Sequence, residues 1–347
     1  MRWLAGKVVS ALAVLATLSV ASTLLTRYMD TYYFVVLIQC GIAITLAVSL
    51  NLINGITGQF SIGHAGFYAI GAYVGAAWTV LWRPALVGLF PVLEIGTLSG
   101  DALNLCLAVV LGAVAAGIAG FVVGLPSLRL RGDYLAILTL GFGEVIRVVL
   151  LNLDSVGGAR GLSGIPTLVS AHELAVFWVF LLVVAVVALS RNLMRTVRGL
   201  TWLAVREDEI AAEAMGVGTT SVKVTAFIIG SGFAGAAGVL YAHYFTGISP
   251  DVFGMDVSII ITTMVVLGGS GSVTGSILAA SLLTATPELL RGLVPMLKDY
   301  RLVIFSTMLV VVMLTRPQGL FGHGEIGYAT ARGLLRRLRR APSSAGG

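Results

Sequence analysis

Long runs of apolar residues, separated by short polar segments, follow one another along almost the whole chain. A helix needs about 20 predominantly apolar residues to cross a bilayer. Strands of a membrane barrel would instead alternate apolar and polar residues over segments of about ten. The pattern therefore predicts helical spans near residues 8–26, 33–53, 64–82, 104–125, 134–153, 174–190, 222–246, 256–268, 273–290 and 300–315.

The run 256–268 is too short for a comfortable crossing. We interpret it as a half-helix or as part of a re-entrant pair with the run 273–290. The predicted fold class is an all-α polytopic membrane protein with about eight to ten transmembrane helices, including broken or re-entrant segments.

Composition supports lipid as the main solvent of this chain. Of 347 residues, 57% are hydrophobic and 11% are charged, and the mean hydropathy is +0.98. A soluble domain carries roughly 25% charged residues. The 43 glycines favour close helix packing, because small residues let transmembrane helices approach one another.

Basic residues predict the orientation. With the N-terminus inside and the ten spans above, 15 of the 22 Lys and Arg residues fall on the inner side, including the run RGLLRRLRR at 332–340. We expect both termini to be cytoplasmic, the first run to be a retained span, and the tail 331–347 to lie against membrane lipid. The net charge of +6 reflects this asymmetry and implies no nucleic acid partner.

No segment is long enough for a nucleotide-binding domain, and no G-x-x-x-x-G-K-[ST] loop is present. The glycine-rich stretch 267–275 lacks lysine and lies among spans, so it predicts a helix break or close packing. If ATP drives this protein, another chain must bind it.

The polar segment 198–218 has helical periodicity. Its apolar residues share one face and its charged residues lie mainly on others, and Gly216 and Gly218 then end the helix. Such a helix needs a surface against which to bury its apolar stripe, and its acidic residues would be repelled by an anionic leaflet. We therefore expect a protein partner. The apolar stripe comprises Leu200, Leu203, Ile210, Ala211, Ala214 and Met215.

Residues 210–216, IAAEAMG, are similar to the E-A-A-x-x-x-G signature of permeases of ATP-binding cassette (ABC) importers, which forms a coupling helix that docks on an ATPase subunit. Ile210 stands where that signature has Glu, with Glu209 one residue before it. The resemblance implies a coupling helix containing Arg206, Glu207, Asp208, Glu209, Ala211, Ala212, Glu213 and Gly216.

Several longer blocks resemble LivM-type branched-chain amino acid permeases. These blocks are 51–73, 125–150, 157–166, 241–254 and 264–280, and the resemblance extends over roughly 30–320. Leu200 and Leu203 depart from the family, which often carries basic residues there. The expected organisation is a permease domain at 1–330, with its coupling loop at 191–221, and a cytoplasmic tail at 331–347.

The same resemblance implies an inner-membrane importer working by alternating access. Its partners would be a related permease subunit, two ABC ATPase subunits that hold ATP and Mg²⁺, and an extracytoplasmic solute-binding protein. No cofactor, metal or catalytic residue is expected in this chain. A urea or short-amide importer of similar sequence, or an ion-coupled secondary transporter, are the alternatives. A membrane enzyme is not supported by any catalytic motif.

Polar residues and glycines gather between the second and third predicted spans. Non-helical backbone at membrane depth is tolerated only where it is buried in protein or lines a cavity. We interpret this cluster either as part of the translocation path or as a polar loop joining two helices. Its polar members are Asn51, Asn54, Gln59, Ser61 and His64.

Glu144 and Arg147 are three residues apart on the fifth predicted span, so they share a helix face. Charges within the membrane usually face the bundle interior or a water-filled cavity. They either contact a zwitterionic substrate, form a structural ion pair or relay protons. On the outer side, Arg160 and Ser163 are candidates for docking the binding protein, although a solvated loop is an equal alternative.

Overall fold

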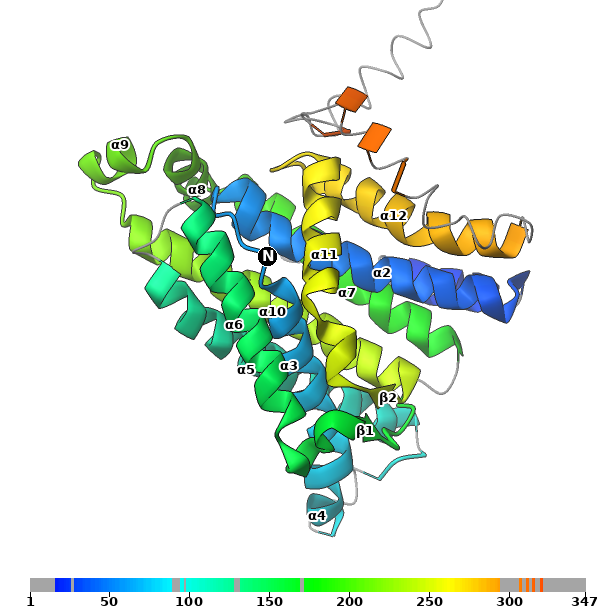
Figure 1. Cartoon of the computed structure of the whole chain (residues 1–347). Coiled ribbons are helices and arrows are strands. Elements are labelled where there is room, and N and C mark those ends of the chain that lie inside the picture. Colours follow the sequence, from blue (N-terminus) through cyan, green and yellow to red (C-terminus); the bar gives the residue numbers. More distant parts are fainter. Residues whose placement is uncertain are drawn as a thin grey trace, which may run out of the picture.

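The computed structural model describes residues 16–25, 28–88, 94–96, 98–127, 132–168 and 172–293, with short pieces between 306 and 320. This part contains eight helices long and apolar enough to cross a membrane (Figure 1). They are Thr31–Ile56, His64–Val87, Ser99–Pro126, Asp133–Leu151, Leu174–Met194, Thr219–Phe245, Pro250–Gly268 and Val273–Leu290.

The predicted class, an all-α polytopic membrane protein, is confirmed. Eight of the ten predicted runs correspond to these spans. The first run is described only as the shorter helix Ala16–Leu25, and most of the run 300–315 and the tail 331–347 lie outside the described residues.

The α-helices are α2 (Thr31–Asn51), α3 (His64–Ala77), α4 (Arg83–Val87), α5 (Leu98–Ser127), α6 (Asp133–Leu151), α7 (His172–Met194), α8 (Val197–Glu207), α9 (Glu209–Ala214), α10 (Thr219–Phe245), α11 (Met255–Gly268) and α12 (Val273–Leu293). Wider π-helical turns, Leu52–Ile56 and Trp78–Trp82, extend α2 and α3. Short 3₁₀ turns cover Asp154–Val156, Gly158–Arg160 and Pro250–Phe253.

Two ends of the bundle can be distinguished (Figure 1). At one, α8 and α9 protrude beside the last turns of α2 and the turn between α11 and α12; we call this the coupling end. At the other, strand β1 (Leu162–Ser163) pairs antiparallel with β2 (Gly247–Ile248); we call this the ribbon end. Helices α6, α10 and α11 run between these two ends.

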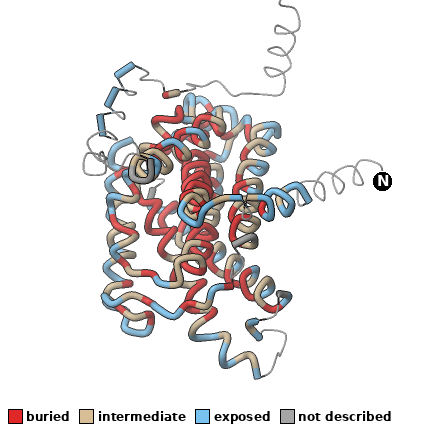
Figure 2. Tube along the Cα trace, turned by 90° about the vertical axis from the view of Figure 1, so that its right-hand side faces the viewer, coloured by how far each residue is buried: buried red, intermediate tan, exposed pale blue. Residues whose placement is uncertain are grey.

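The core is built around α10, which packs on α2, α3 and α5. Glycines bring these helices into backbone contact, because Gly235 of α10 lies directly against Gly71 of α3 and Gly112 of α5. Buried residues follow the middle of the bundle and exposed ones its outside (Figure 2). The close packing predicted from glycine content is thus present.

The span ending at Gly268 corrects one prediction. Helix α11 has 14 residues and alone would measure about 21 Å. However, the 3₁₀ turn Pro250–Phe253 precedes it and extends the span to 19 residues, from the ribbon end to the coupling end. The combined segment is long and apolar enough to cross a membrane, which favours a full span over the predicted half-helix or re-entrant pair. The irregular backbone lies instead between α2 and α3.

Candidate functional site

The segment Thr57–Gly63 has no helical structure, yet it reaches into the bundle. Directly after it, His64 Nε2 lies 2.8 Å from the hydroxyl of Ser49, both side chains being fully buried. Ser49 precedes the end of the α2 span at Ile56 by about two helical turns, or about 10 Å. The chain therefore turns back into the bundle before α3 begins.

Side chains from three other helices satisfy the backbone of this segment. The amide of Ile62 donates to Thr139 Oγ1 of α6 (3.1 Å), and the amide of Ala65 donates to Ser258 Oγ of α11 (3.1 Å). Asn54 bonds both the amide and the carbonyl of Ser61, at 3.1 and 3.0 Å. This is how non-helical backbone is tolerated away from water.

The five polar residues predicted at this junction lie together but differ in their surroundings. Asn51, Ser61 and His64 are fully buried, Gln59 is 5% exposed and Asn54 is half-buried. Within the described residues, Asn51 Nδ2, Gln59 Oε1, Ser61 Oγ and His64 Nδ1 have no hydrogen-bond partner. Gln59 also lines a small polar cavity of about 190 Å³ that reaches Arg206 and Lys223. Their part in a translocation path stays a prediction.

The predicted single helix at 198–218 is wrong in one respect, because it is two helices. Asp208 adopts extended backbone angles and ends α8. Its carboxylate accepts hydrogen bonds from the amides of Ile210 and Ala211, at 2.9 and 3.0 Å, and so caps the N-terminus of α9. Gly216, with φ of +82°, ends α9 as predicted, since a left-handed residue there favours glycine.

The acidic residues of α8 and α9 have partners within the chain. Glu209 pairs with the buried Lys223 of α10, and Glu207 accepts from Arg206 at 2.6 Å. Glu213 accepts from the hydroxyl of Thr219 at 2.8 Å. The contacts of Glu209 and Glu213 hold α9 to α10, whereas Glu207 pairs with its neighbour within α8. These carboxylates are therefore not simply an acidic surface for a partner.

Apolar side chains instead cover the outer surface of α8 and α9. Met215 is 84% exposed, Ile210 68% and Leu200 61%. The inner face of α8 is formed by Trp202 and Val205, which are buried. The stripe predicted from the sequence is thus largely exposed, except that Leu203 is half-buried.

Arg206 connects α8 with the bundle. Its Nη1 donates to the carbonyl of Gly55, in the π-helical end of α2, at 3.1 Å. Nearby, Asn51 Oδ1 accepts from the amide of Gly271, in the turn between α11 and α12, at 2.9 Å. A displacement of α8 would therefore act directly on α2 and, through α2, on the α11–α12 turn.

The predicted pair on α6 is present. Arg147 Nε donates to Glu144 Oε2 at 2.8 Å, and Arg147 Nη1 lies 3.4 Å from Asp251 Oδ1 in the turn before α11. This ion pair ties α6 to the start of α11 near the ribbon end. Both side chains of the α6 pair remain partly exposed, at 27% for Arg147 and 34% for Glu144.

Arg160 and Ser163 lie at the ribbon end. Arg160 ends the second 3₁₀ turn and Ser163 is in β1, opposite Gly247 of β2. Both are exposed, so either can contact another molecule. Their docking role stays a prediction.

Sequence reasoning missed residues that support the irregular segment and helix α9. Thr139, Ser258 and Lys223 are buried polar residues in apolar spans or beside the coupling loop. A single hydroxyl in an apolar run was the available signal for the first two, but it did not reveal which backbone group each would bind.

In the described part of the chain, eight apolar helices with an irregular polar segment among them and a helix pair protruding from one end define a polytopic α-helical membrane protein. The chain belongs to the family described as branched-chain amino acid transport system / permease component, which matches residues 32–313.

Two similar relatives are high-affinity branched-chain amino acid transport system permease proteins LivM. That of Salmonella typhimurium is 37% identical and that of Escherichia coli K12 is 38% identical, each over 309 residues that cover 80% of this chain and 67% of the relative. The LivH permease of Salmonella typhimurium is 25% identical over 300 residues, which cover 81% of this chain and 91% of LivH. No solved structure matches the chain.

Proposed function

We propose that this chain is the membrane-spanning subunit of an ATP-driven importer of branched-chain amino acids. The observation that carries the proposal is the exposed apolar surface of α8 and α9, held on the bundle by internally paired acidic residues. Apolar side chains at a water-facing end are stabilised when a partner covers them. The family and the names of its relatives supply the solute class.

In this proposal the coupling end is cytoplasmic, as are both termini, and the ribbon end faces outward. An ATPase subunit covers α8 and α9, and the partner ATPases bind ATP and Mg²⁺. The similarity of this chain to both LivM and LivH relatives supports pairing with a related permease subunit. A solute-binding protein delivers the amino acid near Arg160 and Ser163.

The proposed mechanism is alternating access without bond chemistry in this chain. Closure of the ATPase pair moves α8 and α9, and the contact of Arg206 with Gly55 passes that movement to α2. ATP drives the change because the ATPases have different affinities for the two conformations of the permease.

Reconstitution tests the function. We assemble the chain in proteoliposomes with the related permease subunit, the ATPase subunits and the solute-binding protein. Uptake of radiolabelled leucine is then measured. We expect uptake that requires ATP and persists after ion gradients are collapsed. Uptake of urea or acetamide in place of leucine would contradict the proposed solute, and uptake driven by an ion gradient alone would contradict the proposed class.

Arg206→Met is expected to uncouple transport from ATP hydrolysis. Methionine retains an extended apolar side chain but cannot donate to the Gly55 carbonyl, and a hydrogen bond to a charged group contributes about 1.5–3 kcal/mol. Leucine uptake per ATP hydrolysed should fall about tenfold or more. The measurement is the ratio of uptake to phosphate release in the reconstituted complex.

Arg198→Met is the matched control, because Arg198 is exposed on the same helix and has no side-chain partner in the described part of the chain. Equal coupling ratios in the two variants would rule out transmission through Arg206.

A further inference from the structure

A cavity of about 390 Å³ lies between the middle turns of α2, α11 and α12, where α3 and α10 complete its wall. Most of its lining is aliphatic, and Leu46, Ile261 and Met264 are at most 4% exposed. Its size and mixture of groups fit a small-molecule site, since such sites are mainly apolar with a few polar groups that fix orientation.

Four polar side chains also line this cavity. They are Gln39 of α2, Tyr68 of α3, Tyr241 of α10 and Thr284 of α12. Within the described residues, none of them has a hydrogen-bond partner through its side chain. Tyr68 is only 4% exposed, so its hydroxyl is withdrawn from bulk solvent while it lines the cavity.

Packing fixes the two tyrosine rings. The Tyr68 ring meets the Phe253 ring edge-on at a centroid distance of 5.0 Å, and the Tyr68 and Tyr241 rings lie 5.7 Å apart. Such edge-to-face arrangements orient aromatic side chains. The hydroxyl groups are therefore placed by ring packing alone, which leaves them available to a bound molecule.

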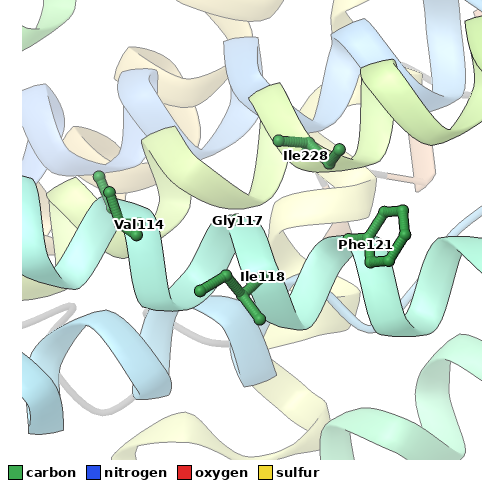
Figure 3. Close-up of a pocket in the computed structure, with 6 residues that line it drawn as sticks. Val114, Gly117, Ile118, Phe121 and Ile228 are labelled. Atoms are coloured by element: carbon green, nitrogen blue, oxygen red, sulfur yellow. The ribbon is translucent and has the colours of Figure 1, made fainter.

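A second hollow has a different character (Figure 3). It measures about 480 Å³ and is lined by apolar residues of α5 and α10, among them Val114, Ile118, Phe121 and Ile228. These residues are 37–60% exposed on the outside of the bundle. The described residues that line this hollow offer no polar side chain to a solute, so the hollow suits contact with lipid.

We propose that the cavity between α2, α11 and α12 holds the amino acid within the membrane. The inference rests on the proposed function and adds the location of the site. The aliphatic side chain of the solute packs against Leu46, Ile261 and Met264. Its ammonium and carboxylate groups bind the hydroxyls of Tyr68 and Tyr241 and the amide of Gln39.

The chemistry of the lining selects a neutral zwitterion. Hydroxyl and amide groups both donate and accept hydrogen bonds, so they can bind an ammonium and a carboxylate group. Among the described residues, no charged side chain lines this cavity, which disfavours solutes with net charge. A lipid acyl chain in the same place would leave the polar groups unpaired, which is costly away from water.

The first test uses the complete reconstituted complex and radiolabelled leucine. Tyr68→Phe removes one hydroxyl and keeps the ring packing, and it is expected to lower leucine uptake about tenfold, the effect of one lost hydrogen bond. Ile261→Trp is expected to fill the cavity and abolish uptake. Ile118→Trp, in the outer hollow of Figure 3, should transport like the unmodified complex.

Substrate protection is the second test. Ile260 lines the cavity and is 42% exposed. In a complex with Cys40 and Cys106 replaced by alanine, leucine should slow alkylation of an Ile260→Cys variant, whereas lysine should not. Equal protection by both amino acids, or by neither, would overturn the site.

The two proposals fail separately. If the unmodified complex does not take up leucine, the proposed function is wrong. If it takes up leucine but Tyr68→Phe and Ile261→Trp match Ile118→Trp, the function stands and the cavity is not the site.

Discussion

Replacing Ile210 and Met215 together by aspartate is expected to release the ATPase subunits and reduce ATP-dependent leucine uptake to background. Both side chains are exposed on α9 or at its end, at 68% and 84%. Burying a side chain of this size contributes about 1.5–3 kcal/mol, so covering both would contribute about 3–6 kcal/mol to docking. Losing that contribution weakens binding by about two to four orders of magnitude.

The measurement is the amount of ATPase that co-purifies with the permease in detergent, together with uptake in proteoliposomes. The control pairs Ile210→Leu with Met215→Leu, which preserves the apolar surface. The acidic contacts that hold α9, including that of Glu209 with Lys223, are untouched in both proteins. Full retention of the ATPase by the aspartate variant would refute docking through this surface.

Gly235→Leu is expected to prevent the bundle from folding. A Cβ atom at this position would lie 2.5 Å from the Cβ of Ala116 and 2.6 Å from the carbonyl oxygen of Gly112. Carbon atoms in contact are normally about 3.5–4.0 Å apart. Because α10 already touches both α3 and α5 here, the steric clash can be relieved only if the helix backbones move apart. We expect this separation to lower the free energy of unfolding by about 3 kcal/mol or more.

Gly141→Leu provides a matched control in α6, where Gly141 is exposed and a new Cβ would meet nothing within 4 Å. Thermal unfolding in detergent should show the control near the unmodified protein and Gly235→Leu as aggregated or much less stable. Similar unfolding temperatures would mean that α3, α5 and α10 are not packed this closely.

The spans were the most predictable part of the fold. An apolar run of about 20 residues has few alternatives in a membrane, because its backbone groups must be satisfied within the helix. The length of the run 256–268 was underestimated because the prediction considered only its apolar residues. The 3₁₀ turn that begins at Pro250 extends the helical segment to 19 residues.

The coupling region was predicted in place but not in form. Helical periodicity continues through Asp208, so the break between α8 and α9 does not disturb the apolar pattern. An aspartate before a run of helix formers is itself a cap signal, and its two hydrogen bonds to the α9 amides account for the break. The pairing of Glu209 with Lys223 could not be predicted, because it requires the start of α10 to pack beside α9 in the folded chain.

The cavity proposed for the solute was not visible in the sequence. Gln39, Tyr68, Tyr241 and Thr284 come from four helices and belong to no common motif. Each one alone reads as an ordinary polar residue within a span. Only the packing of α2, α3, α10 and α12 brings them to one space.

The dependence of the 57–65 backbone on distant hydroxyls also sets an order of events during synthesis. The amide of Ala65 takes its acceptor from Ser258, 193 residues further along the chain. Most of the protein must therefore be synthesised before this hydrogen bond can form. Until then, the early helices lie in the translocon or in lipid without the Ser258 hydroxyl as an acceptor for the Ala65 amide. Final consolidation of the permease is consequently post-insertional, and a nascent chain truncated before α11 lacks the hydroxyl that closes it.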